Sequence, residues 1–160
     1  MLQPKSMGEA LKKRVKQARF NNPGQEALIN LLIAASHIRE LLDSACSEFG
    51  ITHGQYNVLR ILRGANPNGY ARNEIAERMV EKAPDVTRLV DRLEGQGLVK
   101  RDRSDEDRRQ SITRITQKGL DLLVQVDEQV KQVHENFRSR LSVKDCEQLS
   151  RLCEGIYGEQ

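Results

Sequence analysis

At 160 residues, the chain has room for one domain, or two closely integrated lobes, with a substantial hydrophobic core. Charged residues make up 31% of the chain and aromatic residues only 4%, while Leu, Val and Ile supply most apolar positions. This composition favours a mainly helical protein over a β-sandwich or barrel. The net charge of +3 is weak evidence for a nucleic-acid partner, because ordinary soluble proteins carry the same value.

Membrane and secretory classes are excluded by pattern. No apolar run approaches the roughly 20 residues of a membrane span. The basic N-terminus lacks the apolar core of a secretory signal. Cys46, Cys146 and Cys153 have no CxxC spacing and are too few for a disulfide framework. We therefore expect a cytoplasmic protein with reduced thiols and no membrane partner.

Basic residues are concentrated in two places. Residues 1–22 carry six lysines and arginines against the single Glu9, and residues 98–116 carry six more. The first cluster also contains Leu11 and Val15. It suits a DNA-contacting arm and equally a helix that docks on a partner subunit, and the sequence does not choose between them.

Two helices are predicted ahead of residue 65. Residues 21–24 separate the basic leader from a long helix, whose apolar positions recur at steps of three and four from Leu28 to Phe49. Gly50 is the expected stop. The next helix begins at a capping box, Thr52–Gln55, and ends in a loop at residues 64–69.

Residues 73–97 have the pattern of a helix-turn-helix. A first short helix presents Ile75 and Met79, and Pro84 is predicted at a first-turn position of the second helix, where its missing N–H costs nothing. The second helix stops at Gly95 and Gly97 and has one apolar face. The residues of that face are Val86, Leu89, Val90 and Leu93.

Residues 98–103 and 110–116 are predicted to form two strands of an arginine-rich hairpin, after which Thr116 caps another helix. Alternation in the second strand is imperfect, so the register is left open. A helix-turn-helix followed by such a hairpin fits DNA. The second helix can enter the major groove while the hairpin reaches toward the neighbouring minor groove. The residues therefore predict a DNA-binding protein.

The C-terminal region is predicted to supply a dimer surface. One helix carries an apolar seam at steps of three and four, a pattern that packs against a partner helix. The seam is formed by Leu123, Val126, Val130, Val133 and Phe137. A core within the same chain is the alternative, but so narrow a stripe near a C-terminus is more often a partner surface. The last helix, capped by Ser142, adds Leu149 and Ile156.

Three segments carry a resemblance to a known family: PDVTRLVDRLEGQGLVKR, then DEDRRQ, then ITQKG. In this order they resemble the MarR family of bacterial winged-helix transcriptional regulators, and with the flanking helices the resemblance extends from about residue 25 onward. It implies a mainly α fold with a small β-wing: a winged helix-turn-helix with intertwined N- and C-terminal dimerisation helices. It also implies a homodimer on a palindromic operator of double-stranded DNA, often as a repressor. Release on binding a small aromatic effector, or on thiol oxidation, is frequent, and no cofactor is implied.

The resemblance assigns roles to individual residues. Thr87 and Arg88 match positions that reach into the major groove, and Asp107 and Arg109 match a wing-tip Asp-x-Arg, in which the Asp orients an Arg for minor-groove insertion. The remaining predicted contacts are Asp85 and Arg92 in the major groove, Arg103 and Arg108 in the wing, and Arg72 and Lys82 on the backbone. The chain departs from the family at Asp85, where a small hydroxyl residue is common, and in the turn before Pro84, which lacks the usual glycine. These departures affect the half-site sequence and the turn geometry.

Each assignment has a structural alternative. Arg88 could pair with Asp85 or Asp91 at i,i+3 for a few tenths of a kcal/mol, instead of discriminating a guanine by about 1–3 kcal/mol. The wing could be a solvated hairpin laced by its own acids. The cysteines are predicted to be buried structural residues rather than oxidant sensors, and the scattered histidines predict no metal site.

Three regions and one leading hypothesis result. Residues 1–50 are the basic leader and a dimerisation helix, 51–116 the DNA-binding lobe, with the helix-turn-helix at about 73–96 and the wing at about 98–116, and 117–160 the C-terminal dimerisation helices. The leading hypothesis is a homodimeric regulator, a repressor whose operator affinity a small-molecule effector changes.

Two other hypotheses are weaker. A winged-helix protein-interaction module that has lost sequence-specific DNA recognition is suggested by the balanced charges of the helix from 84 to 97. An enzyme is not predicted, because the chain lacks a recognisable Cys/His pair, a Gly-rich phosphate loop and paired catalytic acids.

Overall fold

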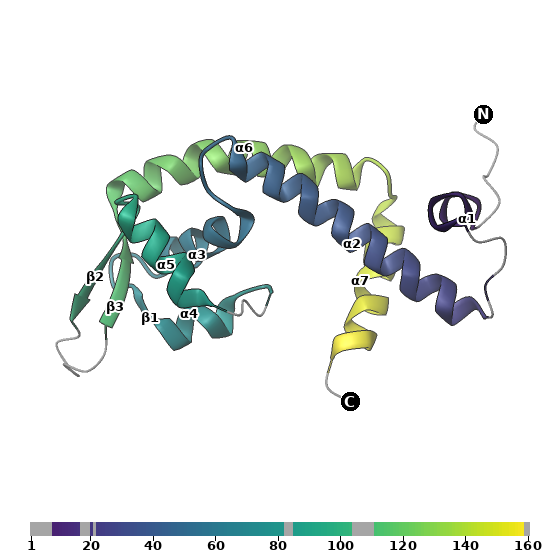
Figure 1. Cartoon of the computed structure of the whole chain (residues 1–160), viewed down its shortest axis with the longest axis horizontal. Coiled ribbons are helices and arrows are strands. Elements are labelled where there is room, and N and C mark those ends of the chain that lie inside the picture. The colour runs from purple at the N-terminus through teal and green to yellow at the C-terminus, as the bar shows by residue number, and fades with distance from the viewer. Residues whose placement is uncertain (1–7, 17–19, 21, 82–84, 104–110, 159–160) are drawn as a thin grey trace. The chain divides into compact units, whose positions relative to one another are not determined.

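The computed structural model describes residues 8–16, 20, 22–81, 85–103 and 111–158, which divide into two compact units between Leu41 and Leu42 (Figure 1). The N-terminal unit holds α1 (Glu9–Val15) and most of α2 (Pro23–Ser47). Leu11 of α1 is buried and borders a shallow groove with Asn30 and Ile33 of α2. Within the basic leader, Glu9–Val15 therefore form a short helix that lies against α2 of the same chain.

The C-terminal unit begins with the end of α2 and is mainly helical, with one small sheet (Figure 1). Its elements are α3 (His53–Gly64), β1 (Tyr70–Ala71), α4 (Arg72–Arg78), α5 (Val86–Gly95), β2 (Val99–Arg103), β3 (Ser111–Ile115), α6 (Gln117–Arg138) and α7 (Val143–Tyr157). This architecture confirms the predicted mainly α fold with a winged helix-turn-helix. In the described part of the chain, no helix combines the length and apolar character that crossing a bilayer demands.

The sheet is antiparallel with strand order β1-β3-β2. The hairpin register, left open by the sequence, runs from Val99 opposite Ile115 to Arg103 opposite Ser111. The two-residue strand β1 was not predicted. It forms because Gly69, at a positive φ of 76°, lets the chain approach the Thr113 carbonyl, where any side chain would collide.

The core of the C-terminal unit lies around α3. Side chains from four helices meet there without exposure to solvent. They are Leu59 and Leu62 of α3, Ile75 of α4, Leu93 of α5, and Leu123 and Val126 of α6. At roughly 1.5–3 kcal/mol for each fully buried large apolar side chain, this cluster is the main source of the unit's stability. It also fixes α5 against α3 and α6.

The predicted dimer seam on α6 was wrong in its first half. Leu123, Val126 and Val130 are buried in the chain's own core, against α3 and its neighbours, so they cannot face a partner subunit. Only the second half remains available, because Val133 is half-buried and Phe137 is 38% exposed. Periodicity correctly identified an apolar face but not which chain covers it.

The last helix, α7, has no buried residue in the single chain. Leu149 is 38% exposed and Ile156 70% exposed in the single chain, and their place on a partner surface stays a prediction. Cys146 and Cys153 are only half-buried, short of the burial expected for them. Cys46 is fully buried at the end of α2, and this burial, with the nearby charge of Asp43, raises the pKa of its thiol to about 11. A thiol of this kind is inert.

Helix starts follow local capping. The predicted box is present at α3, where Thr52 Oγ1 accepts from the Gln55 N–H and the Gln55 side chain accepts from the Thr52 N–H. Thr116 caps α6 as expected, by accepting from the Gly119 N–H at 3.1 Å. The described part of α5 begins at Val86, with Asp85 as its cap, and the predicted first-turn residue Pro84 lies outside the described residues.

A polar cluster fastens α3 to the middle of α6. Asp127 of α6 accepts hydrogen bonds from Tyr56 Oη at 2.7 Å and from Arg63 Nη1 at 2.5 Å. Partial burial opposes ionisation of Asp127, but the bonds from Arg63 and Tyr56 outweigh it and lower its pKa. Burial, with the hydrogen bond to Asp127, raises the pKa of Tyr56. The ionised carboxylate therefore holds α6 to α3.

Asp127→Asn should lower the free energy of unfolding at pH 7 by about 1–3 kcal/mol, because two bonds to a charged acceptor are weakened. The stability that comes from a lowered carboxyl pKa is present above the unfolded value of about 3.9 and is lost as pH falls through the folded value. The difference between variant and wild type should therefore shrink below about pH 4. Urea unfolding at one protein concentration measures it, and Asp121→Asn, on the exposed face of α6, serves as control. An unchanged difference at low pH would contradict the role of the charge.

Candidate nucleic-acid interface

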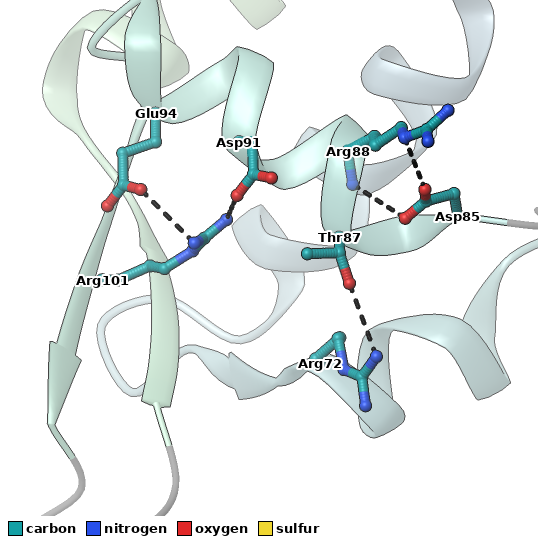
Figure 2. A network of polar contacts seen from close by, with 7 residues as sticks. All are labelled: Arg72, Asp85, Thr87, Arg88, Asp91, Glu94 and Arg101. Atoms are coloured by element: carbon teal, nitrogen blue, oxygen red, sulfur yellow. Dashed lines mark hydrogen bonds and ion pairs between the residues drawn. The ribbon is translucent and has the colours of Figure 1, made fainter.

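The helix α5 presents two different faces because its apolar residues recur on one side. Val86, Val90 and Leu93 are buried against the core. Arg88 and Arg92 are exposed, and the other polar members of the outward face are Thr87 and Asp91. The helix α4 precedes α5 in the chain and lies beside it, so α5 has the position of the second helix of a helix-turn-helix, as predicted (Figure 2).

At the start of α5, Asp85 and Arg88 form a closed pair. Asp85 Oδ1 accepts from the Arg88 backbone N–H at 3.0 Å, which caps the helix, and Asp85 Oδ2 lies 2.8 Å from Arg88 Nε. The ion pair between Asp85 and Arg88, which the sequence offered as the alternative to a DNA contact by Arg88, is therefore formed. Asp85 was expected to contact DNA, but both of its carboxylate oxygens are occupied within the chain.

Arg101 of β2 joins the wing to α5. Its guanidinium hydrogen-bonds to Asp91 through Nη2, while Nη1 lies 3.6 Å from Glu94 Oε2 (Figure 2). Arg101 is only 30% exposed, so this bridge lies partly shielded from solvent between β2 and α5. Sequence reasoning placed Arg101 in the basic ribbon without assigning it a role. The bridge links residues ten apart on different elements, a spacing no helical rule indicates.

Arg72 lies across the gap between α4 and α5. Its Nη1 donates to Thr87 Oγ1 at a long 3.4 Å. These two residues line a recess of about 440 Å³, together with Val90 of α5 and Arg101 of β2, and with Ser111 and Thr113 of β3. The recess brings one residue predicted for the major groove, Thr87, beside one predicted for the backbone, Arg72.

The base of the wing is stabilised by charge pairs of its own. Arg114 Nη1 donates to Asp102 Oδ2 at 2.6 Å across the hairpin, and Lys100 Nζ approaches the same oxygen at 3.4 Å. The hydrogen bond from Arg114, with help from Lys100, holds the pKa of Asp102 below its usual value. Asp102 thus pairs with one basic side chain from each strand, as the solvated-hairpin alternative supposes for this part of the wing.

Several predicted contacts lie outside the described residues. They are Lys82 before α5, and Asp107, Arg108 and Arg109 in the turn between β2 and β3. Arg103 belongs to β2, although its side chain is not described. Arg92 is exposed and makes no ion pair with any described residue. The structure therefore brings Arg72, Thr87, Arg88 and Arg92 to one region, and the wing tip stays a prediction.

Comparison with known proteins relates this lobe to one family. Residues 51–111 match the model of the MarR family. A crystal structure of a MarR transcription factor from Planctomyces limnophilus is 39% identical, covers 85% of this chain and 98% of its own, and superimposes with a TM-score of 0.66. A mutant MarR from Escherichia coli in complex with operator DNA is similar in fold, with 23% identity over 84% of this chain and 94% of its own and a TM-score of 0.72.

A curated relative from Thauera aromatica, whose name assigns it to transcriptional regulation of the hcr operon, is 30% identical over 108 residues. The match covers 68% of this chain and 64% of that protein, so it spans just under two thirds of the relative's length.

The Arg101–Asp91 bridge should be measurable as a coupling energy. A double-mutant cycle of Arg101→Met and Asp91→Ala, read by urea unfolding, is expected to give about 0.2–1 kcal/mol, the usual range for partly exposed pairs. The cycle of Arg92→Met with Asp91→Ala is the matched control, because neighbouring residues on a helix do not face each other, and it should give a value near zero. Equal values in both cycles would argue against the bridge.

Proposed function

The chain belongs to the MarR family of transcription factors, and we propose that it is a DNA-binding regulator that acts as a homodimer on a palindromic operator. One observation carries the proposal. The outward face of α5, with Thr87, Arg88 and Arg92, stands beside an arginine-rich hairpin on a lobe whose remaining helices bury the opposite face. This arrangement suits a helix in the major groove and a wing along the backbone. That the Escherichia coli MarR structure contains operator DNA supports the same assignment.

The ion pair between Arg88 and Asp85 is compatible with DNA binding. The Arg88 side chain is 80% exposed and that of Asp85 39% exposed, so solvent screens their attraction. Such pairs contribute about 0–1 kcal/mol, whereas a bidentate contact to guanine discriminates by about 1–3 kcal/mol. A guanine at the right position can therefore bind Arg88, either in place of Asp85 or together with it, with little loss of free energy from the ion pair.

Sequence-independent affinity must come mainly from outside α5. That helix and its cap contain two arginines, Arg88 and Arg92, and three acids, so they carry no net positive charge to neutralise phosphates. The acids are Asp85, Asp91 and Glu94. We assign phosphate and minor-groove contacts to the wing and to the flank of α4. The residues are Arg103, Arg108 and Arg109, with Asp107 orienting the tip, and Arg72 and Lys82. Binding should weaken with salt in proportion to these contacts.

Dimerisation is supported by apolar side chains that the single chain leaves uncovered. On α7, Leu152, Ile156 and Tyr157 are at least 60% exposed, and Phe137 at the end of α6 is 38% exposed. We propose that Val133, Phe137, Leu149 and Ile156 are covered by a second copy of the chain. A twofold dimer is what a palindrome requires, with recognition helices about 34–36 Å apart.

We further propose that operator binding represses transcription and that a small aromatic effector relieves it. The recess beside Thr87 has a volume of about 440 Å³, within the usual range of small-molecule sites. A ligand there would lie against residues of the same helix that faces DNA. A coupling of about 1–3 kcal/mol between ligand and operator is enough to change occupancy 5- to 150-fold.

Arg88→Ala and Arg109→Ala should weaken DNA binding in different ways. The probes are a duplex from the DNA upstream of the chain's own gene and a scrambled duplex of the same composition, titrated by fluorescence anisotropy at several salt concentrations. Loss of a base contact in Arg88→Ala should cost about 1–3 kcal/mol on the upstream duplex alone. Arg109→Ala should weaken both duplexes and reduce the salt slope.

Arg140→Ala, in the turn after α6, is the control and should bind like wild type. Wild type that shows no salt-sensitive binding to either duplex would refute the proposed function. If both arginine variants kept full regulatory activity in cells, the protein-interaction alternative would take its place.

Ile156→Arg should yield a folded monomer, because Ile156 is 70% exposed and contributes nothing to the core of its own chain. Burying an unpaired charge in an apolar interface is strongly unfavourable, so the substituted surfaces should not associate. Sedimentation velocity should show half the wild-type mass, circular dichroism an unchanged helix content, and anisotropy a large loss on the upstream duplex. Ser150→Arg, an exposed polar position on the same helix, is the control. A dimeric Ile156→Arg would remove α7 from the interface.

A further inference from the structure

We propose that Asp85 is a positioning residue for base recognition, which holds Arg88 so that its two terminal nitrogens face a guanine in the major groove. The inference rests on the proposed function and names one base preference of its site. It gives Asp85 a role that acts through Arg88, in place of the direct DNA contact predicted from the sequence.

The two carboxylate oxygens of Asp85 make different contacts. Asp85 Oδ1 is fixed by the N-terminus of α5, since it accepts the backbone N–H of Arg88 at 3.0 Å. Asp85 Oδ2 is then held beside the helix, where it meets Arg88 Nε at 2.8 Å (Figure 2). Because the first contact immobilises the acid, the second restrains an arginine side chain that is 80% exposed and would otherwise sample many rotamers.

The contact through Nε leaves the other end of the guanidinium available. Neither terminal nitrogen of Arg88 hydrogen-bonds to any residue that the structure describes, and the side-chain contact drawn to Asp85 in Figure 2 starts at Nε. Two coplanar N–H donors match the O6 and N7 acceptors that guanine alone presents together in the major groove. A lysine could not be held in this way, because it lacks both the Nε–H and the planar fork.

The same carboxylate should act in opposite directions on two kinds of DNA. On a matched site it orients Arg88 in advance, which reduces the cost of immobilising that side chain on binding. On unmatched DNA there is no base contact to orient, and the negative charge only opposes the phosphates. This opposition separates positioning from a plain electrostatic effect or a plain capping effect.

Asp85→Asn is the direct test, because Asn caps a helix about as well as Asp but offers one oxygen instead of two. The second position becomes an amide donor facing the Arg88 donor. On the upstream duplex, we expect a loss of about two- to tenfold in affinity. On the scrambled duplex, affinity should stay equal or rise, and the thermal midpoint should remain near that of wild type.

The Arg88→Ala background completes the cycle. There Asp85→Asn should no longer weaken binding to the upstream duplex, since no side chain remains to be positioned. In selection from a duplex pool with a randomised half-site, wild type should enrich guanine at one position that Asp85→Asn and Arg88→Lys both relax.

Each other outcome overturns the inference by a different route. A rise on both duplexes would mean that Asp85 acts only by charge repulsion, and no change on either would leave it as a cap alone. Wild type that binds neither duplex would instead refute the proposed function, and this inference with it.

Discussion

The burial of one face of α5 is the constraint on which the interface depends. Val86, Val90 and Leu93 enter a core built around α3, and a helix fixed along that face has a single orientation about its axis. Thr87, Arg88 and Arg92 face outward as a consequence, and the contacts of Arg72 with Thr87 and of Asp85 with Arg88 act on side chains that the buried face has already turned outward. The acids of α5 then fall where Arg101 of β2 can bridge them, so the hairpin is linked to the same helix. Specific chemistry at the surface thus follows from nonspecific apolar contacts beneath it.

Local patterns determined most of what could be predicted from the sequence. The helix-turn-helix, the two hairpin strands and the caps at Thr52 and Thr116 depend on residues within a few positions of one another, so their signals are contained in short segments. The errors involve distant partners. The stripe at Leu123 shows that a face is apolar, but its cover by α3 comes from about 60 residues away in the chain. Likewise β1 is too short to have a pattern, and exists because Thr113 pairs with it.

Charge compensation characterises the described part of the interface. Asp85 meets Arg88, Asp91 and Glu94 meet Arg101, and Asp102 meets Arg114. A surface balanced in this way attracts a polyanion weakly, whatever its sequence. Under the proposed function, discrimination would therefore come from exchanging or sharing these partners with bases rather than from raw attraction. Spacing of two lobes in a dimer would act on top of this, because both helices must complete the exchange together.

The segment that leads into the wing is also joined closely to the start of α6. Thr116 donates to the carbonyl of Gly97, its N–H bonds to that of Leu98, and Gly119 packs against the Leu98 carbonyl so closely that no side chain could fit. For protein engineering, these contacts limit which pieces of the lobe can be exchanged. A transplanted segment from Asp85 to Gly95 must keep the side chains that fill the core and the two acids that Arg101 contacts. A foreign hairpin must likewise arrive with its own first turn of α6, because a graft cut at residue 116 would leave mismatched backbones at the joint.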